Sequence, residues 1–167
     1  MRGAIWVLNI FAAIWGAIGL GKFGSPTMAT PIIVSAALIV WGSQIPSLPR
    51  PPGEGARIGR LIGVWSSVEG VAIFATFALS KRFGVPDVVV PILAIIVGLH
   101  FLPLARGIPM PLYFGTAAAM IAVGAGALLL PATERYAATG IPCAAILWAS
   151  CVALILRGAR QSAASQI

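Results

Sequence analysis

The chain has 167 residues, of which 59% are hydrophobic and only 9% are charged. A soluble domain of this size carries about 25% charged residues to solvate its surface, so most of this surface is expected to face lipid. The formal net charge is +7, but the basic residues stand singly or in pairs at the ends of apolar runs, as topology signals do. These features predict an all-α integral membrane protein and exclude nucleic acid as a partner.

Six apolar runs are long enough, or nearly so, to cross a bilayer as helices, which takes about 20 residues each. In chain order they are residues 4–21, 27–46, 61–80, 86–105, 112–131 and 141–157. The runs are too long and too continuously apolar for the alternation of a membrane β-barrel. We therefore expect a single transmembrane domain, residues 1–167, with six transmembrane helices.

Charged or Pro/Gly-rich segments separate these runs. Residues 47–60 are expected to form the one extended polar loop, while the other connections, including Pro131 to Gly140, are expected to be short turns. Short turns predict antiparallel neighbours. The first run follows Arg2 but has no small-x-small cleavage site before Lys22, so we expect it to be a first membrane helix and not a cleaved signal.

A sequence repeat suggests that the domain is built from helical hairpins. The segment Lys22-Phe23-Gly24-Ser25-Pro26, with Pro31 following, matches Arg82-Phe83-Gly84-Val85-Pro86 with Pro91, sixty residues later. A weaker third copy is Gly140-Ile141-Pro142. Three repeated hairpins are the reading we favour, although membrane proteins also reuse Gly and Pro at helix ends.

Basic residues also predict the orientation. Under six spans, seven Lys and Arg residues fall on the side of the termini and four on the other side. Cytoplasmic loops carry the excess of Lys and Arg, so both termini are expected in the cytoplasm, with the protein multi-pass in a bacterial inner membrane.

Two stripes of small residues are candidate helix-packing faces. Ala13, Ala17 and Gly21 are spaced by four residues, as are Ala118, Ala122 and Gly126. Small side chains at this spacing let helix backbones approach closely in lipid.

Only two ionisable residues lie well inside the predicted spans, Glu69 in the third and His100 in the fourth. An ionisable residue within a membrane span is costly and is by default a candidate functional site. At 1.5 Å per residue, Glu69 lies about 12 Å and His100 about 8 Å from the same predicted end of the bundle. We therefore expect the two side chains to form a hydrogen bond or an ion pair.

Further polar residues are predicted at a similar level, in the cytoplasmic halves of their helices. They are Asn9, Gln44, Ser66, Ser67, Tyr113, Thr116 and Ser150. On the third span Ser66, Glu69, Thr76 and Ser80 share one helix face, which is expected to point into the bundle. Together they predict a one-sided polar pocket around Glu69 and His100.

The sequence contains few residues that could bind a cofactor. A single intramembrane His excludes bis-histidine haem, and a His/Met pair has no supporting motif. HExxH, GxSxG, P-loop and paired acidic motifs are absent from the sequence, as is any zinc-binding spacing. Cys143 and Cys151 would lie about 12 Å apart along one helix, too far for a mutual disulfide. No cofactor and no metal are predicted.

The run from Val97 to Ala105, Val-Gly-Leu-His-Phe-Leu-Pro-Leu-Ala, resembles a signature of small bacterial multispan membrane proteins of unknown function. In those proteins a Glu in the preceding helix accompanies it, which here is Glu69 within Val68-Glu69-Gly70. The resemblance covers residues 60–115. It implies a role for Glu69 and His100 and nothing about a substrate.

Three functions are compatible with these observations. The first is binding or transport of a small or lipophilic solute at a Glu69–His100 pocket, with a proton exchanged, since imidazole changes charge nearest neutral pH. The second is an intramembrane enzyme acting on a lipid-like substrate, with Glu69 as general acid or base. The third is a structural or accessory subunit. The expected partners are the lipid bilayer and such a ligand, and a homo-oligomer is compatible with the sequence.

Overall fold

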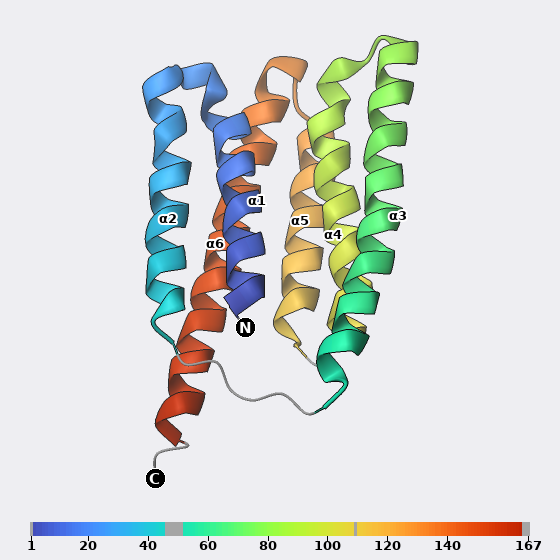
Figure 1. Ribbon diagram of the computed structural model, residues 1–167. Coiled ribbons are helices and arrows are strands. Elements are labelled where there is room, and N and C mark those ends of the chain that lie inside the picture. The colour runs from blue at the N-terminus through green and yellow to red at the C-terminus, as the bar shows by residue number, and fades with distance from the viewer. Residues whose placement is uncertain (1, 46–51, 109, 165–167) are drawn as a thin grey trace. The chain divides into compact units, whose positions relative to one another are not determined.

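The computed structural model describes residues 2–45, 52–108 and 110–164, and over these ranges it contains only helices and their connections. The α-helices are α1 (Arg2–Leu20), α2 (Ala29–Ser43), α3 (Glu54–Phe83), α4 (Val89–Gly107), α5 (Leu112–Leu128) and α6 (Ala132–Ala164) (Figure 1). Three short 3-10 helices are η1 (Gly21–Phe23), η2 (Ser25–Met28) and η3 (Pro86–Val88). Five of the helices are long and apolar enough to cross a membrane, and α5 is a shorter apolar helix. The predicted all-α fold with six helices is confirmed.

Two helices extend well beyond the apolar runs, so two predicted connections are wrong. α3 begins at Glu54 and not near residue 61, and α6 begins at Ala132 and not near residue 141. A search for apolar runs misses the polar turns that continue a helix past the hydrocarbon. In both helices an acidic residue, Glu54 or Glu134, lies in the first turn, where it interacts favourably with the helix dipole. Residues 47–51 of the predicted loop lie outside the described residues.

The chain forms two compact units. Unit 1 comprises Met1–Pro49 and Gly140–Ile167, and unit 2 comprises Arg50–Thr139. Unit 1 therefore contains α1, α2 and most of α6, whereas unit 2 contains α3, α4, α5 and the first turns of α6.

In unit 1, glycines allow close helix contacts. A Cβ atom on Gly16 would lie 2.6 Å from the Pro31 side chain, so α1 and α2 nearly touch there. A Cβ on Gly140 would lie 2.5 Å from the Gly19 backbone nitrogen, which brings α6 equally close to α1. Backbones can approach in this way only where side chains are minimal.

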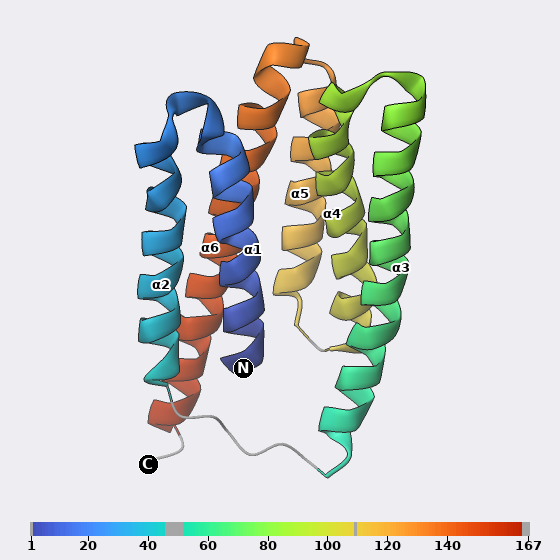
Figure 2. The same ribbon diagram turned by 45° about the horizontal axis from the view of Figure 1, so that its top comes forward.

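In unit 2, α4 packs against both α3 and α5, and the three helices alternate in direction (Figures 1 and 2). Gly98 and Gly124 form the α4–α5 contact: a Cβ on Gly98 would lie 3.0 Å from Ala117 O, and one on Gly124 would lie 2.5 Å from Pro91 O. Because α4 is packed on two sides, half of its span is buried, whereas on α3 only Ser80 is buried.

The predicted small-residue stripe of α5 does not make the close contacts expected of it. Ala118, Ala122 and Gly126 are all exposed on α5, and no atom lies within 4 Å of a Cβ built on Gly126. Ala13 and Ala17 on α1 are half-buried, whereas a Cβ on Gly21, in η1, meets open space. Spacing by four defines a helix face but does not say whether that face meets a neighbouring helix. The close helix contacts are made instead at Gly16, Gly19, Gly98 and Gly124.

The α1–α2 and α3–α4 hairpins match in geometry, which supports the predicted repeat. Gly24 and Gly84, sixty residues apart, end the two turns with positive φ of 101° and 67°. Each is followed by a 3-10 turn containing a Pro, and the second helices begin sixty residues apart, at Ala29 and Val89. A positive φ suits glycine, so both turns use the shared Gly for a backbone angle that other residues rarely adopt, although only Gly84 is in the left-handed helical conformation.

The third copy does not form a hairpin turn. Gly140 to Pro142 lie inside α6, and Gly140 is not among the glycines with positive φ. The connection between α5 and α6 falls instead at residues 129–131. Gly140 serves close packing against α1, a use of glycine that the sequence alone does not distinguish from a turn.

Candidate functional site

Glu69 and His100 come together between α3 and α4, as predicted. His100 Nδ1 lies 3.4 Å from Glu69 Oε2, and the side chains are 11% and 12% exposed, respectively. The distance is that of an ion pair and exceeds the usual N–H···O range of about 2.7–3.2 Å. Among the described residues Nδ1 has no hydrogen-bond partner, so a buried imidazole nitrogen stays unsatisfied.

The pair lies near the middle of α3, and the register of the α3–α4 hairpin explains why the two residues meet. Leu61 contacts Gly107 near the other end of the same antiparallel hairpin, and the register it sets brings Glu69 opposite His100. Each residue lies on the helix face that packs against the other helix. Mid-span depth raises the cost of leaving either group ionised and alone.

The outer surface of α3 beside the pair is apolar and open. Val68 is 52% exposed and Val71 is 70% exposed. Ser66, which we predicted to point into the bundle, is also exposed, so that expectation is wrong for Ser66. The polar stripe turns progressively inward along α3 and reaches a buried position only at Ser80. Glu69 is therefore the polar residue of α3 that meets His100 near the middle of the helix.

Tyr113 and Thr116 lie in the α4–α5 contact, on the other side of α4. The Tyr113 ring packs against Phe101 with 5.6 Å between ring centroids, while Thr116 donates a hydrogen bond to Leu112 O at 3.1 Å. Both are buried. α4 thus presents His100 to α3 and the adjacent Phe101 to α5, which ties the His100 backbone to a packed aromatic pair.

Asn9 and Gln44 belong to unit 1. Gln44 is exposed and caps the C-terminus of α2 with its backbone. Asn9 is fully buried, and its Nδ2 donates to Ile5 O and to Cys151 Sγ, each at 2.9 Å. Its Oδ1 has no partner among the described residues. The sixty-residue shift of the repeat places Asn9 at the position of Glu69, so the first hairpin carries a neutral amide where the second carries an acid.

A third polar contact in unit 1 was not predicted. Trp148 Nε1 on α6 donates a hydrogen bond to Ser35 Oγ on α2 at 3.0 Å. No motif or spacing in the sequence pairs Trp148 with a serine so far away in the chain.

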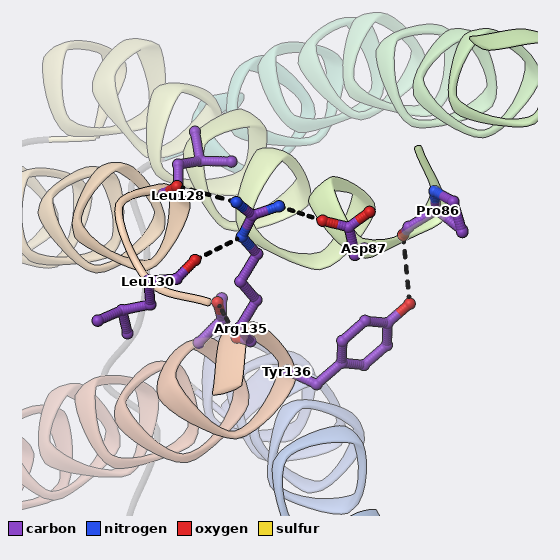
Figure 3. Close-up of polar contacts among 7 residues, drawn as sticks. Pro86, Asp87, Leu128, Leu130, Arg135 and Tyr136 are labelled. Carbon is purple, nitrogen blue, oxygen red and sulfur yellow. Dashed lines mark hydrogen bonds and ion pairs between the residues drawn. The ribbon is translucent and has the colours of Figure 1, made fainter. Parts of the chain in front are cut away.

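Unit 2 also contains an arginine-centred cluster that the sequence does not predict. Arg135, in the first turn of α6, forms an ion pair with Asp87 of η3 (Figure 3). Its guanidinium also donates to Leu130 O at 3.0 Å and to Leu128 O at 3.2 Å. These carbonyls belong to the C-terminal end of α5, where backbone acceptors lack helical partners and a cation is favourable.

The neighbouring residue completes this connection. Tyr136 OH donates to Pro86 O at 3.3 Å, next to Asp87 (Figure 3). One turn of α6 therefore holds the start of α4 and the end of α5 together. The signal available in the sequence is that Asp87 and Arg135 carry opposite charges and lie near the ends of predicted apolar runs.

Metal-binding capacity is limited in the described part of the chain. Within residues 2–45, 52–108 and 110–164 no group of three or more His, Cys, Asp or Glu is placed to hold a metal ion. Cys143 and Cys151 are free and buried. The Glu69–His100 pair supplies a carboxyl group and an imidazole, two groups that can exchange a proton or form a hydrogen bond or ion pair.

No protein-family model, curated protein or solved structure matches this chain.

Proposed function

We propose that this protein binds a small or lipophilic solute at the Glu69–His100 pair and moves it within or across a bacterial inner membrane. Binding or release of the solute is coupled to a proton carried by the pair. Both termini face the cytoplasm in this proposal, in keeping with the distribution of Lys and Arg.

One observation carries the proposal: an unsatisfied imidazole nitrogen and a carboxylate lie 3.4 Å apart on adjoining apolar helices. A pair needed only to join the helices would be expected to close into a hydrogen bond, since an unmade buried bond costs about 1–3 kcal/mol. The open contact leaves both groups able to bond a third partner.

The surroundings of the pair favour a solute that reaches it from the lipid. Glu69 is partly exposed, and the α3 residues beside it expose large apolar surfaces. A lipophilic molecule with one polar group can place that group at the pair and keep its apolar part along α3.

The test uses a hydrophobic carbodiimide, which modifies protonated carboxyl groups in apolar surroundings. In vesicles containing the purified protein, mass spectrometry should find the adduct on Glu69 and none at position 69 in Glu69→Gln. We then add a lipophilic cation (tetraphenylphosphonium), a neutral aromatic (indole) or a lipophilic anion (tetraphenylborate). At least one should slow modification of the native protein, because it occupies the pair.

The matched control is Ser66→Ala, one turn away on the exposed side of α3. It should be modified and protected as the native protein is. Glu69→Gln should remain folded in detergent, since the amide keeps the volume and hydrogen bonding of the acid. If no probe slows modification and Glu69→Gln changes only thermal stability, the pair is structural and the proposal fails.

An accessory subunit role is the second candidate, and α3 is the observation that favours it. Of its residues only Ser80 is buried, although it is the second-longest helix, and the small-residue stripe of α5 is also exposed. A larger membrane partner could cover these faces. In that case the protein should co-purify with that partner, and the carbodiimide experiment should show no solute protection.

A further inference from the structure

One end of the α3–α4 hairpin gathers three arginines. Arg57 and Arg60 lie in the first turns of α3, and Arg106 lies in the last turn of α4. Arg57 Nη1 donates to Gly107 O at 3.0 Å, which fixes the two helix ends against each other. Arg60 and Arg106 are exposed, and neither forms an ion pair with another described residue.

The charge at this end is strongly unbalanced. Glu54, in the first turn of α3, is the acidic residue there, so three guanidinium groups stand against one carboxylate. Arg57 is already engaged with the carbonyl at the end of α4, which leaves Arg60 and Arg106 to attract an anion. A guanidinium group binds phosphate through two parallel hydrogen bonds, which a single ammonium group does not match.

The adjoining surface of α3 changes from polar to apolar within two turns. Residues 54–60 continue the helix about 10 Å beyond the apolar run, at 1.5 Å per residue, and carry the arginines past the hydrocarbon. Just inside lie Ile62, Val64 and Trp65, which are 41%, 55% and 37% exposed. An indole at this level suits the boundary between headgroups and acyl chains.

We propose that this end of the hairpin is a binding site for an anionic phospholipid. Arg60 and Arg106 hold the headgroup phosphate, and the acyl chains run along the exposed apolar surface of α3. The arginines are followed along α3 by apolar surface, just as the phosphate of a phospholipid is followed by its acyl chains. A free phosphate would contact the arginines alone. The inference does not rest on the Glu69–His100 pair.

The test measures thermal unfolding of the delipidated full-length protein in neutral detergent, with added phosphatidylglycerol or phosphatidylcholine. Phosphatidylglycerol should raise the melting temperature, and phosphatidylcholine should do so much less. In Arg60→Gln/Arg106→Gln the shift should be largely lost, and native mass spectrometry should find at least tenfold weaker binding of phosphatidylglycerol. Arg60→Lys, which keeps the charge but loses the paired hydrogen bonds, should bind with intermediate affinity.

The control is Arg157→Gln/Arg160→Gln, which removes the same charge from exposed positions near the end of α6. It should respond to phosphatidylglycerol as the native protein does. Equal loss in both double variants would show that net charge alone attracts the lipid and would overturn the site. Full replacement of the lipid effect by millimolar inorganic phosphate would likewise overturn it. If the double variant does not fold, the affinity of Arg60→Lys for phosphatidylglycerol serves as the test. An affinity equal to that of the native protein would contradict the proposal.

Discussion

At the scale of single residues, Gly140 lies so close to α1 that only a hydrogen atom fits. A Cβ at this position would be 2.5 Å from Gly19 N and 2.6 Å from Trp15 O, both backbone atoms that cannot rotate away. Gly140→Ala should therefore push α6 from α1 and lower the free energy of unfolding by about 1–3 kcal/mol, the usual cost of overpacking. Unfolding by SDS titration or by heat in detergent would measure the loss.

The control for this substitution is Gly126→Ala in α5, where a new Cβ meets open space. It should leave stability nearly unchanged or raise it slightly, because Ala has the higher helix propensity. If Gly140→Ala were as harmless as Gly126→Ala, the close α1–α6 contact would be wrong.

The Glu69–His100 pair could be predicted because it depends on depth, which helix rise determines, and on antiparallel neighbours, which a short turn determines. The direction in which the other polar side chains point could not be predicted in this way. Ser66 lies one turn from Glu69 yet is exposed, because α3 packs against a single helix over this stretch and its buried face is narrow. The polar face predicted for α3 is therefore wider than the part of α3 that contacts α4.

At the scale of helices, Arg135 joins three of them through one guanidinium group. Arg135→Gln removes the ion pair with Asp87 and the charge-assisted bonds to the end of α5. Bonds to charged groups contribute about 1.5–3 kcal/mol when buried. Since Arg135 and Asp87 are 19% and 32% exposed, we expect a smaller loss of stability, about 1–2 kcal/mol. Hydrogen exchange should accelerate chiefly in the last turn of α5.

A double-mutant cycle separates this role from a general effect of charge. Asp87→Asn should cost little in a chain that already carries Arg135→Gln, because the two substitutions remove the same interaction. Arg82→Gln, which removes a cation from the exposed end of α3, should leave exchange in α5 unchanged. Additive losses from Asp87→Asn and Arg135→Gln would contradict the pairing.

Helix number and type followed from the apolar runs, but helix ends did not. The start of α6 was misplaced because Pro131 and Gly140 both looked like breaks, and only Pro131 is one. In a sequence, a proline that precedes a helix and a glycine that lies in a helix–helix contact both look like a break between helices. The Asp87–Arg135 contact was missed for a similar reason, since charges near span ends serve topology in most membrane proteins.

At the scale of the whole molecule, the predicted orientation can be tested with introduced cysteines. Glu54→Cys should react with a membrane-impermeant maleimide only after the inner membrane is permeabilised, whereas Glu134→Cys should react in intact spheroplasts. The native Cys143 and Cys151 are buried and should give little background. The opposite pattern would reverse the topology, and labelling of both positions from one side would contradict the alternation of the helices.

The division of the chain into units bears on how it is made. Unit 2 is one continuous stretch, but unit 1 joins the two ends of the chain, since α6 from Gly140 onward completes it. During synthesis α1 and α2 must therefore wait in the bilayer while about ninety residues follow them, with Asn9 lacking its contact to Cys151 and Ser35 lacking Trp148. In the unfinished protein Asn9 keeps its hydrogen bond to Ile5 O, but Asn9 and Ser35 lack the partners that α6 supplies. A chain truncated before α6 would keep both side chains exposed to lipid, where a membrane quality-control protease or chaperone could recognise them.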